Sequence, residues 1–322
     1  MKLAKGNITV VMLSLVLILT LLFGGVVNAA PKEVVIQTPP VPAALPLLRL
    51  QKTGELDNFL KFDVKVSPDH QRAISLISKN EIDFMVTGVN VGAKIYNKGI
   101  DVKMVNVNTW AIDYLLTNGF KAESWSDLKG KTLSLPLKGG PLDFLARYLL
   151  KENGLDPQND VNLVYRPLPN GAKYFMSGQV DSIILPEPLV SVSLTKSDKA
   201  QLSLDIQKEW GKLHNGDERI PFVGLFVSNQ FVQEYPGLTD IIAGKYIEGV
   251  KYYNNNPEEA IKDASNYFNV PEPVMKKAWS RVDLSLYPDS ESRDLVNTYF
   301  NHILEMYPEM IGGNLPDEAF YY

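Results

Sequence analysis

A glycine turn before an expected helix is the first feature of the chain that could bind a ligand. The stretch LSLPLKGGPLDFLA stops being apolar at Lys138, Gly139 and Gly140, and Pro141 then opens the helix. Glycine lets a backbone N–H approach a ligand closely, and a helix N-terminus adds unpaired N–H groups and a partial positive charge. The turn therefore suits an oxyanion or the polar head of an organic molecule. The alternative is a plain helix cap, in which Asp143 in the first turn satisfies the dipole.

Other loops that follow expected strands also contain side chains suited to ligand binding. In open α/β sheets, ligands bind beyond the carboxyl ends of the strands. Proline lacks an N–H group, so a proline-rich loop offers shape and apolar contact, whereas a Thr-Gly-x-Asn loop offers hydroxyl, amide and backbone donors. The candidate ligand contacts from these loops are Thr38, Pro39, Thr87, Gly88, Asn90, Trp110, Arg166 and Glu187.

These candidates predict a ligand that is held at both ends. The glycine turn would bind its polar head, and the loops at Thr38 and Thr87 would contact its body. For each candidate a structural alternative exists. The prolines stiffen a turn, Trp110 belongs to the core, Arg166 is a solvated surface side chain, and Glu187 caps its own loop.

The residue types that catalyse reactions or bind metals are sparse. The three histidines, His70, His214 and His302, are scattered without the spacing of metal ligands. The chain has no cysteine, which excludes a thiol nucleophile, a zinc thiolate site and a disulfide. No nucleophile-elbow motif occurs. We therefore predict no catalytic residue, no metal and no cofactor, and a protein that is not an enzyme.

Length and composition indicate an ordinary globular protein of about two domains. The chain has 322 residues, 45% of them hydrophobic and 21% charged, with a formal net charge of −5. A nucleic-acid-binding protein normally shows a basic excess or a basic stripe, and neither is present. We therefore expect no nucleic-acid partner.

The first 29 residues read as a secretory signal. Lys2 and Lys5 precede an apolar run over 8–23, and Val27-Asn28-Ala29 supplies a small-residue end with cleavage after Ala29. The alternative is an uncleaved membrane anchor. Because no cysteine follows that could carry a lipid, a cleaved product would be free in the periplasm or another extracytoplasmic space.

Strands and helices are expected to alternate through two successive series, the pattern of a mostly parallel sheet covered on both faces. The stretch 201–221 is expected to be polar and irregular, and 238–310 mainly helical, bracing the body from outside. Expected strands cover 34–37, 62–66, 82–86, 102–107, 111–117, 131–137, 161–165, 182–185 and 222–227, with helices over 45–50, 71–80, 91–97, 141–150 and 172–177.

An internal echo supports two similar halves. The segments 78–86 and 176–184 each combine a helix end, a turn, an apolar residue, an aspartate and a strand, and their aspartates Asp83 and Asp181 lie 98 residues apart. Two lobes of like topology explain this most simply, and a chance likeness of two βα units is the alternative.

Several motifs resemble those of one protein family. The residues Trp125-x-Asp127-Leu128-Lys129-Gly130-Lys131 before the glycine turn, 178–181 leading to Pro186-Glu187-Pro188, and 256–260 (NPEEA) are similar to the solute-binding proteins of importers for nitrate, sulfonates and taurine. The resemblance runs from Val34 to about Tyr322.

The resemblance implies an α/β fold of the type II periplasmic-binding class. Two lobes, each with a mixed, mostly parallel sheet, are hinged by crossing strands and clamp a ligand between them. The implied division is a signal over 1–29, lobe I over 30–114 plus 224–322 with the C-terminal helices, and lobe II over 115–223. The implied function is that of a monomeric solute-binding component that serves an ABC permease and its ATPase in the membrane.

The glycine turn departs from the family pattern. Many members have Ser or Thr there to bind a sulfonate, whereas this chain has Gly139-Gly140-Pro141. The departure speaks against an inorganic anion or a simple sulfonate and leaves a small anionic or polar organic molecule. Two other functions stay open. One is a protein that presents its ligand to a membrane sensor. The other is an enzyme like thiamine-pyrimidine synthase, whose cysteine-rich motif this chain lacks.

Overall fold

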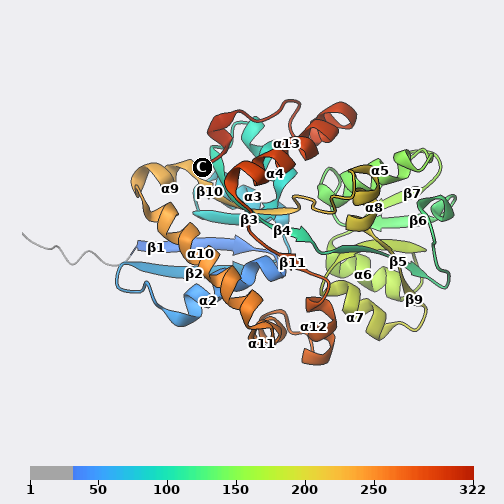
Figure 1. Cartoon of the computed structure of the whole chain (residues 1–322), viewed down its shortest axis with the longest axis horizontal. Helices are drawn as coiled ribbons and strands as arrows, with labels where there is room; N and C mark the ends of the chain where they lie inside the picture. The colour runs from blue at the N-terminus through green and yellow to red at the C-terminus, as the bar shows by residue number, and fades with distance from the viewer. Residues whose placement is uncertain (1–31) are drawn as a thin grey trace, which may run out of the picture.

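The computed structural model describes residues 32–322, and the predicted signal over 1–29 lies outside them. Two β-sheets, each flanked by helices, form two bodies that lie side by side (Figure 1). Within residues 32–322, no helix combines the length and the apolarity that a membrane span requires.

The first sheet has the strand order β11-β4-β10-β3-β1-β2. Strand β1 pairs in parallel with β2 and β3, while β10 runs antiparallel between β3 and β4. We call the body built on this sheet lobe I. Its strands are β1 (Lys32–Thr38), β2 (Leu60–Val66), β3 (Phe84–Gly88), β4 (Val102–Ala111), β10 (Val223–Ser228) and β11 (Asp283–Leu284), and its connecting helices are η1 (Pro42–Ala44), α2 (Leu45–Thr53), α3 (His70–Ser78) and α4 (Val89–Asn97).

The second sheet, which defines lobe II, has the strand order β7-β6-β8-β5-β9. Strand β6 pairs in parallel with β7 and β8, and β5 runs antiparallel between β8 and β9. Its elements are β5 (Asp113–Asn118), η2 (Trp125–Leu128), β6 (Thr132–Leu135), α5 (Pro141–Glu152), β7 (Asn162–Tyr165), α6 (Leu168–Met176), β8 (Ser182–Pro186), α7 (Leu189–Lys196), β9 (Ala200–Asp205) and α8 (Ile206–Leu213).

The two sheets share one topology. In each, the first strand lies between the second and the third, and an antiparallel strand that arrives from the other lobe follows the third. The echoed aspartates occupy matching places. Asp83 accepts a hydrogen bond from the Val35 N–H at 2.8 Å, and Asp181 accepts one from the Thr132 N–H at 2.8 Å. The internal echo is therefore a structural repeat.

Two chain segments connect the lobes. Strand β4 ends at Ala111 and β5 begins at Asp113 in the other sheet, while β10 returns to the first sheet at Val223. The segments run beside each other, because Phe222 N–H donates to the Thr109 carbonyl at 3.1 Å. The two-lobed α/β fold is thus confirmed. The predicted chain boundaries at 114/115 and 223/224 stay predictions.

The C-terminal helices contact both lobes. Helix α10 packs against α2 of lobe I, and α12 packs against α7 of lobe II. The Tyr246 hydroxyl on α10 donates to the Ala43 carbonyl at 3.0 Å. These helices brace the body, as the sequence analysis predicts. They are α9 (Asn229–Glu234), α10 (Leu238–Asn255), α11 (Pro257–Phe268), α12 (Glu272–Trp279) and α13 (Asp289–Met306), followed by η3 (Pro308–Met310) and η4 (Glu318–Phe320).

The sequence prediction of an irregular stretch over 201–221 is wrong for 201–213, whereas 214–221 has no helix or strand. The stretch 201–213 contains most of strand β9 and all of helix α8. Strand β9 lies at a sheet edge and is only half-buried, so its residues keep a polar composition. The Asp205 side chain caps α8 by accepting from the N–H groups of Gln207 and Lys208, while Ile206 and Trp210 are buried. Strand β9 is a short edge strand with one buried residue, and α8 is only eight residues long and buries the polar side chains of Gln207 and Glu209.

Candidate functional site

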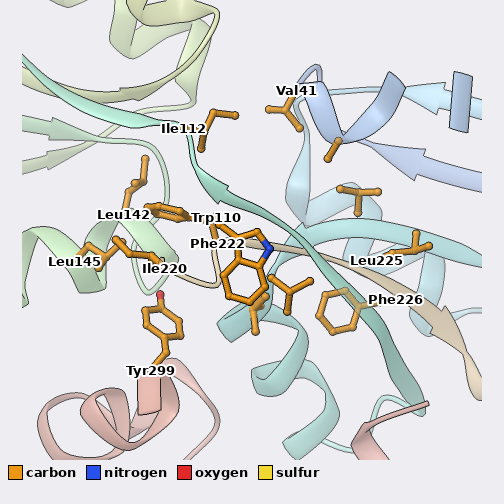
Figure 2. Close-up of a cluster of buried hydrophobic side chains, with 14 of the residues drawn as sticks. Val41, Trp110, Ile112, Leu142, Leu145, Ile220, Phe222, Leu225, Phe226 and Tyr299 are labelled. Atoms are coloured by element: carbon orange, nitrogen blue, oxygen red, sulfur yellow. The ribbon is translucent and has the colours of Figure 1, made fainter. Parts of the chain in front are cut away.

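A cavity of about 90 Å³ lies between the lobes at the carboxyl ends of strands from both sheets. Its walls come from the ends of β3 and β8, from the loops that follow β1 and β6, from the starts of α3, α5 and α6, and from both connecting segments. Figure 2 shows four of the lining residues, Val41, Ile112, Leu142 and Phe222, around one connecting strand. The lining residues are Pro39, Val41, His70, Thr87, Gly88, Val91, Ile112, Asp113, Pro136, Leu137, Gly140, Pro141, Leu142, Leu168, Pro186, Phe222 and Val223.

The cavity walls are mostly apolar. Four prolines and several aliphatic side chains surround it, and no lysine or arginine is among the lining residues. The polar side chains on its walls are those of His70, Thr87 and Asp113. Such a site would bind the body of a small ligand through apolar contact and orient it through a few polar groups.

Asp113 is the carboxyl group of the cavity. The residue is only 3% exposed, and that small surface opens onto the cavity. Apart from the pairing within the sheet, its hydrogen bonds to described residues involve its backbone. The Asp113 N–H donates to Gln207 Oε1 at 3.2 Å, and the Asp113 carbonyl accepts from Gln207 Nε2 at 3.2 Å. Burial raises the pKa of the Asp113 carboxyl well above its usual range. The carboxyl thus lies buried without a partner in the described residues.

His70 and Thr87 are the other two polar groups. His70 begins α3 behind Asp69, whose side chain caps the helix by accepting from the Arg72 N–H. Burial lowers the pKa of His70, so its ring is neutral at pH 7. The Thr87 side chain is buried and makes no hydrogen bond to a described residue. Both side chains can therefore donate to or accept from a ligand.

The amides of the glycine turn already have acceptors. The Gly139 N–H donates to Asp143 Oδ2 at 2.7 Å, and the Gly140 N–H donates to the Leu137 carbonyl at 3.1 Å. Asp143 in the first turn of α5 thus occupies the Gly139 amide, in line with the structural alternative that the sequence left open. The same carboxylate accepts from Arg147 Nε at 2.7 Å. The N–H groups in the first turn of α5, after Pro141, therefore remain available to a ligand.

The lobes touch at the start of α5. Asn90 Nδ2 on α4 of lobe I donates to the Gly139 carbonyl of lobe II at 3.2 Å. Gly88 lies against Pro141, and a Cβ on Gly88 would stand 2.9 Å from the Pro141 Cγ. The structure therefore describes lobes in contact on one side of the cavity.

Five of the twelve predicted contacts line this cavity: Pro39, Thr87, Gly88, Gly140 and Pro141. Lys138 and Gly139 face a separate groove of about 750 Å³ on the outer side of the turn, which Lys94 and Arg147 also line. That groove is larger, but its polar groups include the ion pair of Arg147 with Asp143. The inter-lobe cavity instead gathers the strand-end loops of both lobes, the usual ligand position in such sheets.

The remaining predicted residues lie elsewhere. Trp110 is fully buried in the core and donates from its indole N–H to the Ser285 carbonyl at 3.0 Å. The Arg166 guanidinium stacks over the Tyr174 ring at 4.4 Å. Thr38 is buried, and its hydroxyl donates to the Pro39 carbonyl. None of these is among the cavity-lining residues, and their role as ligand contacts stays a prediction.

Glu187 is buried in a structural tie between distant segments. Its carboxylate accepts from the Ser191 N–H at 3.0 Å and from Arg281 Nη1 at 2.9 Å. It therefore caps α7 and also binds the segment that follows α12. Within residues 32–322, no group of three or more His, Asp or Glu residues could hold a metal ion.

Sequence reasoning missed Asp113 and the apolar walls. The signal for Asp113 was present, because the residue interrupts an apolar strand, AIDYLLT, in which a charged side chain is rare unless it is paired or functional. The walls formed by Ile112, Leu137 and Leu168 give no such signal. They are ordinary apolar residues, and only the packing of the two lobes brings them together.

Comparisons with known proteins fit this arrangement. The model of the NMT1-like family matches residues 90–267. An ABC transporter protein from Parabacteroides distasonis has a TM-score of 0.72 and 20% identity, with 90% of this chain and 98% of that chain covered. No curated protein sequence matches this chain.

Two further similar structures are of proteins that are named for their ligands. The alkanesulfonate-binding protein SsuA from Xanthomonas axonopodis pv. citri, bound to MOPS, has a TM-score of 0.69 and 17% identity over 90% of this chain and 96% of that chain. The periplasmic nitrate-binding protein NrtA from Synechocystis PCC 6803 has a TM-score of 0.70 and 11% identity over 90% and 92%. At these identities the likeness shows the fold, which is that of type II periplasmic-binding proteins.

Proposed function

Because the chain belongs to the NMT1-like family, we propose that it is the solute-binding component of an ABC importer. It would act in the periplasm or another extracytoplasmic space, as a monomer that delivers its ligand to a permease and an ATPase in the membrane. The apparent secretory signal and the fold of periplasmic binding proteins support this location.

The observation that carries the proposal is the position of the cavity. Loops from both lobes and both connecting segments line it, so a bound solute would contact both lobes together. A ligand shifts an equilibrium between open and closed forms only through contacts that differ between them. Contacts to Pro39 and Thr87 of lobe I and to Pro141 and Leu168 of lobe II would form together only when the lobes close.

The cavity limits the size of the solute. At about 90 Å³ it is well below the roughly 300–1,000 Å³ of pockets that hold drug-sized ligands. Either the solute is a molecule of few heavy atoms or the lobes close less fully around a larger one. The apolar walls favour a small organic molecule over a bare inorganic anion.

A direct test is to identify what the protein carries. We expect mass spectrometry of the natively purified protein to find a small organic compound that is released unchanged. Adding it back should raise the melting temperature, because a ligand at 100 times its Kd stabilises by about 2.7 kcal/mol. A protein that carries no solute and gains no stability from any small polar compound would contradict the proposal. Chemical conversion of the bound compound would instead indicate an enzyme.

A further inference from the structure

The inter-lobe cavity contains a buried carboxyl group that the protein itself leaves without a partner. Asp113 is 3% exposed, and it hydrogen-bonds to the Gln207 side chain through its own backbone N–H and carbonyl, not through its carboxyl. Other buried carboxylates of this chain are paired with side chains. Asp143 accepts from Arg147 at 2.7 Å, and Glu187 accepts from Arg281 at 2.9 Å. Asp113 stands out because it lines the cavity and its carboxyl accepts no hydrogen bond from a described residue.

The cavity walls present no positively charged side chain to Asp113 or to a ligand. No lysine or arginine is among the lining residues, and His70 is neutral at pH 7 because burial lowers its pKa. A carboxylate or sulfonate ligand would thus find no cationic side chain in the cavity to offset its charge. The amides of Gly139 and Gly140, which could have bound an oxyanion, already donate within the protein.

We propose that Asp113 selects a ligand with a protonated nitrogen, a small ammonium or amidinium compound with an apolar body. The N–H groups of the ligand would donate to the Asp113 carboxylate, and the apolar body would contact the walls formed by Ile112, Leu142 and Phe222. A charge-assisted hydrogen bond is strongest where water is excluded, as it is here. The inference rests on the proposed function, since it names the ligand class of the same cavity.

The ligand would supply the positive charge that the side chains of the cavity lack. Without a partner the buried Asp113 favours its protonated form, because burial raises its pKa. An approaching ammonium group favours the ionised form, so the pair forms as an ion pair between ligand and strand β5. Asp113 is the first residue of β5, directly after the segment that connects the lobes. A ligand bound there would contact the protein at its hinge.

The test compares probes that share one carbon skeleton and differ only in the polar head. These are isobutylammonium, isobutyramidinium, isobutyrate and isobutanesulfonate, each titrated at pH 7 and followed by melting temperature and ligand-observed NMR. We expect the two cations to bind roughly tenfold or more tightly than the two anions. If an anion binds as tightly as the cations, or more tightly, the inference fails.

Two variants assign the selectivity to Asp113. Asp113→Asn keeps the shape and removes the charge, so the preference for cations should disappear. Asp198→Asn makes the same change at an exposed position in lobe II and should leave the preference intact. If Asp113→Asn retains the full preference, the carboxyl group does not select the ligand and the inference is overturned.

A measurement without ligand guards against a variant that fails to fold. Because the carboxyl is buried and unpartnered, Asp113→Asn should melt at the same temperature as the parent protein or higher. A large fall in melting temperature would mean that the protein itself uses the carboxylate, and would count against the inference. The copurified compound separates the two hypotheses. An anion without basic nitrogen overturns the Asp113 inference and leaves the solute-binding function standing, whereas the absence of any bound solute counts against both.

Discussion

Two buried carboxylates show how differently single residues are treated in this fold. Glu187 is fully buried and accepts hydrogen bonds from the backbone and hydroxyl of Ser191 and from the Arg281 guanidinium. Asp113 is almost as deeply buried and has no such partner. A buried charge is tolerated when it is paired and hydrogen-bonded. Glu187 therefore has a structural role, whereas no described residue supplies such a partner to the Asp113 carboxyl.

Replacing Arg281 by Met should destabilise the protein strongly. The substitution leaves the Glu187 carboxylate buried without its ion partner, and removing one member of a buried pair costs about 3–5 kcal/mol. Because the Arg281 side chain is 30% exposed, we expect a loss of about 3 kcal/mol, at the low end of that range. Urea denaturation measures the free energy of unfolding.

An exposed pair provides the control for Arg281. Arg293 binds Asp289 and Glu318, whose side chains are 80% and 92% exposed. Arg293→Met should lose less than about 1 kcal/mol, because water screens such pairs. Adding Glu187→Gln to Arg281→Met should restore much of the stability. Equal losses in the two Arg→Met variants would show that Glu187 is not held as the structure describes.

Residue roles were harder to predict from sequence than residue positions. The spacing placed the glycine turn correctly before α5, yet it could not decide whether the turn amides were free. That depends on Asp143, whose side chain folds back onto the Gly139 N–H. The sequence also could not show that the Asp113 carboxyl lacks a partner, because residues far apart in the chain form such pairs. Its interruption of an apolar strand was the one local sign.

At the scale of elements, the alternation of strands and helices could be read from the sequence. The period of apolar residues, the glycine after α2 and the proline that opens α5 all mark boundaries that the structure has. Strand β9 and helix α8 were missed, because the edge strand buries a single residue and the short helix buries polar side chains beside Ile206 and Trp210. Gln207 was missed with them, although its side chain bonds the chain at Asp113 as it crosses between the lobes.

The contact between β3 and α5 predicts that Gly88→Ala will hold the lobes apart. The Gly88 backbone, with φ −60° and ψ 137°, accepts any residue, so the variant should fold. Its new Cβ would stand 2.9 Å and 3.0 Å from carbons of the Pro141 ring, which cannot swing aside. We expect a larger radius of gyration by small-angle scattering and faster hydrogen exchange over 87–92 and 137–142.

Gly244→Ala is the matched control for this contact. It adds the same methyl group on helix α10, where nothing lies within 4 Å of the new atom. Its scattering and exchange should equal those of the parent, and its stability should rise slightly, because alanine favours a helix over glycine by about 1 kcal/mol. If Gly88→Ala behaves like Gly244→Ala, the lobes do not meet at Pro141 in solution.

At the scale of the whole molecule, the last long helix joins the two lobes. Helix α13 packs on β4 of lobe I, while its aromatic side chains reach α5 and α8 of lobe II. The Tyr299 ring lies edge-on to Phe144 with centroids 5.2 Å apart. His302 lies next to His214, with their Nε2 atoms 3.0 Å apart. The repeated lobe topology was predictable from the internal echo, whereas this link was not, because residues 88 positions apart form it.

The pair of histidines predicts that acid weakens the link between α13 and lobe II. His214 Nδ1 lies 2.8 Å from the Trp210 carbonyl, so this nitrogen carries the proton and Nε2 is the acceptor for the His302 Nε2–H. A proton added to His214 Nε2 would place two N–H groups face to face. Burial lowers the pKa of both rings. Glu152 acts in the opposite direction on both pKa values, and Glu305 does so on that of His302.

The sign of the effect follows from the lowered pKa values. The unfolded chain takes up protons near pH 6.5, while the folded histidines do so at lower pH. Between those values the unfolded state binds more protons, so the free energy of unfolding falls as the pH drops through 6.5 and levels off below the folded pKa.

His70 and the carboxylates add their own pH dependence, so the informative quantity is a difference between two proteins. His302→Gln removes one titrating ring and keeps an amide that can donate to His214. The parent should exceed this variant in melting temperature most at pH 7.5, and its advantage should shrink by pH 5.5. If the melting temperatures of the two proteins change in parallel between pH 7.5 and pH 5.5, the histidine pair does not couple the lobes to pH.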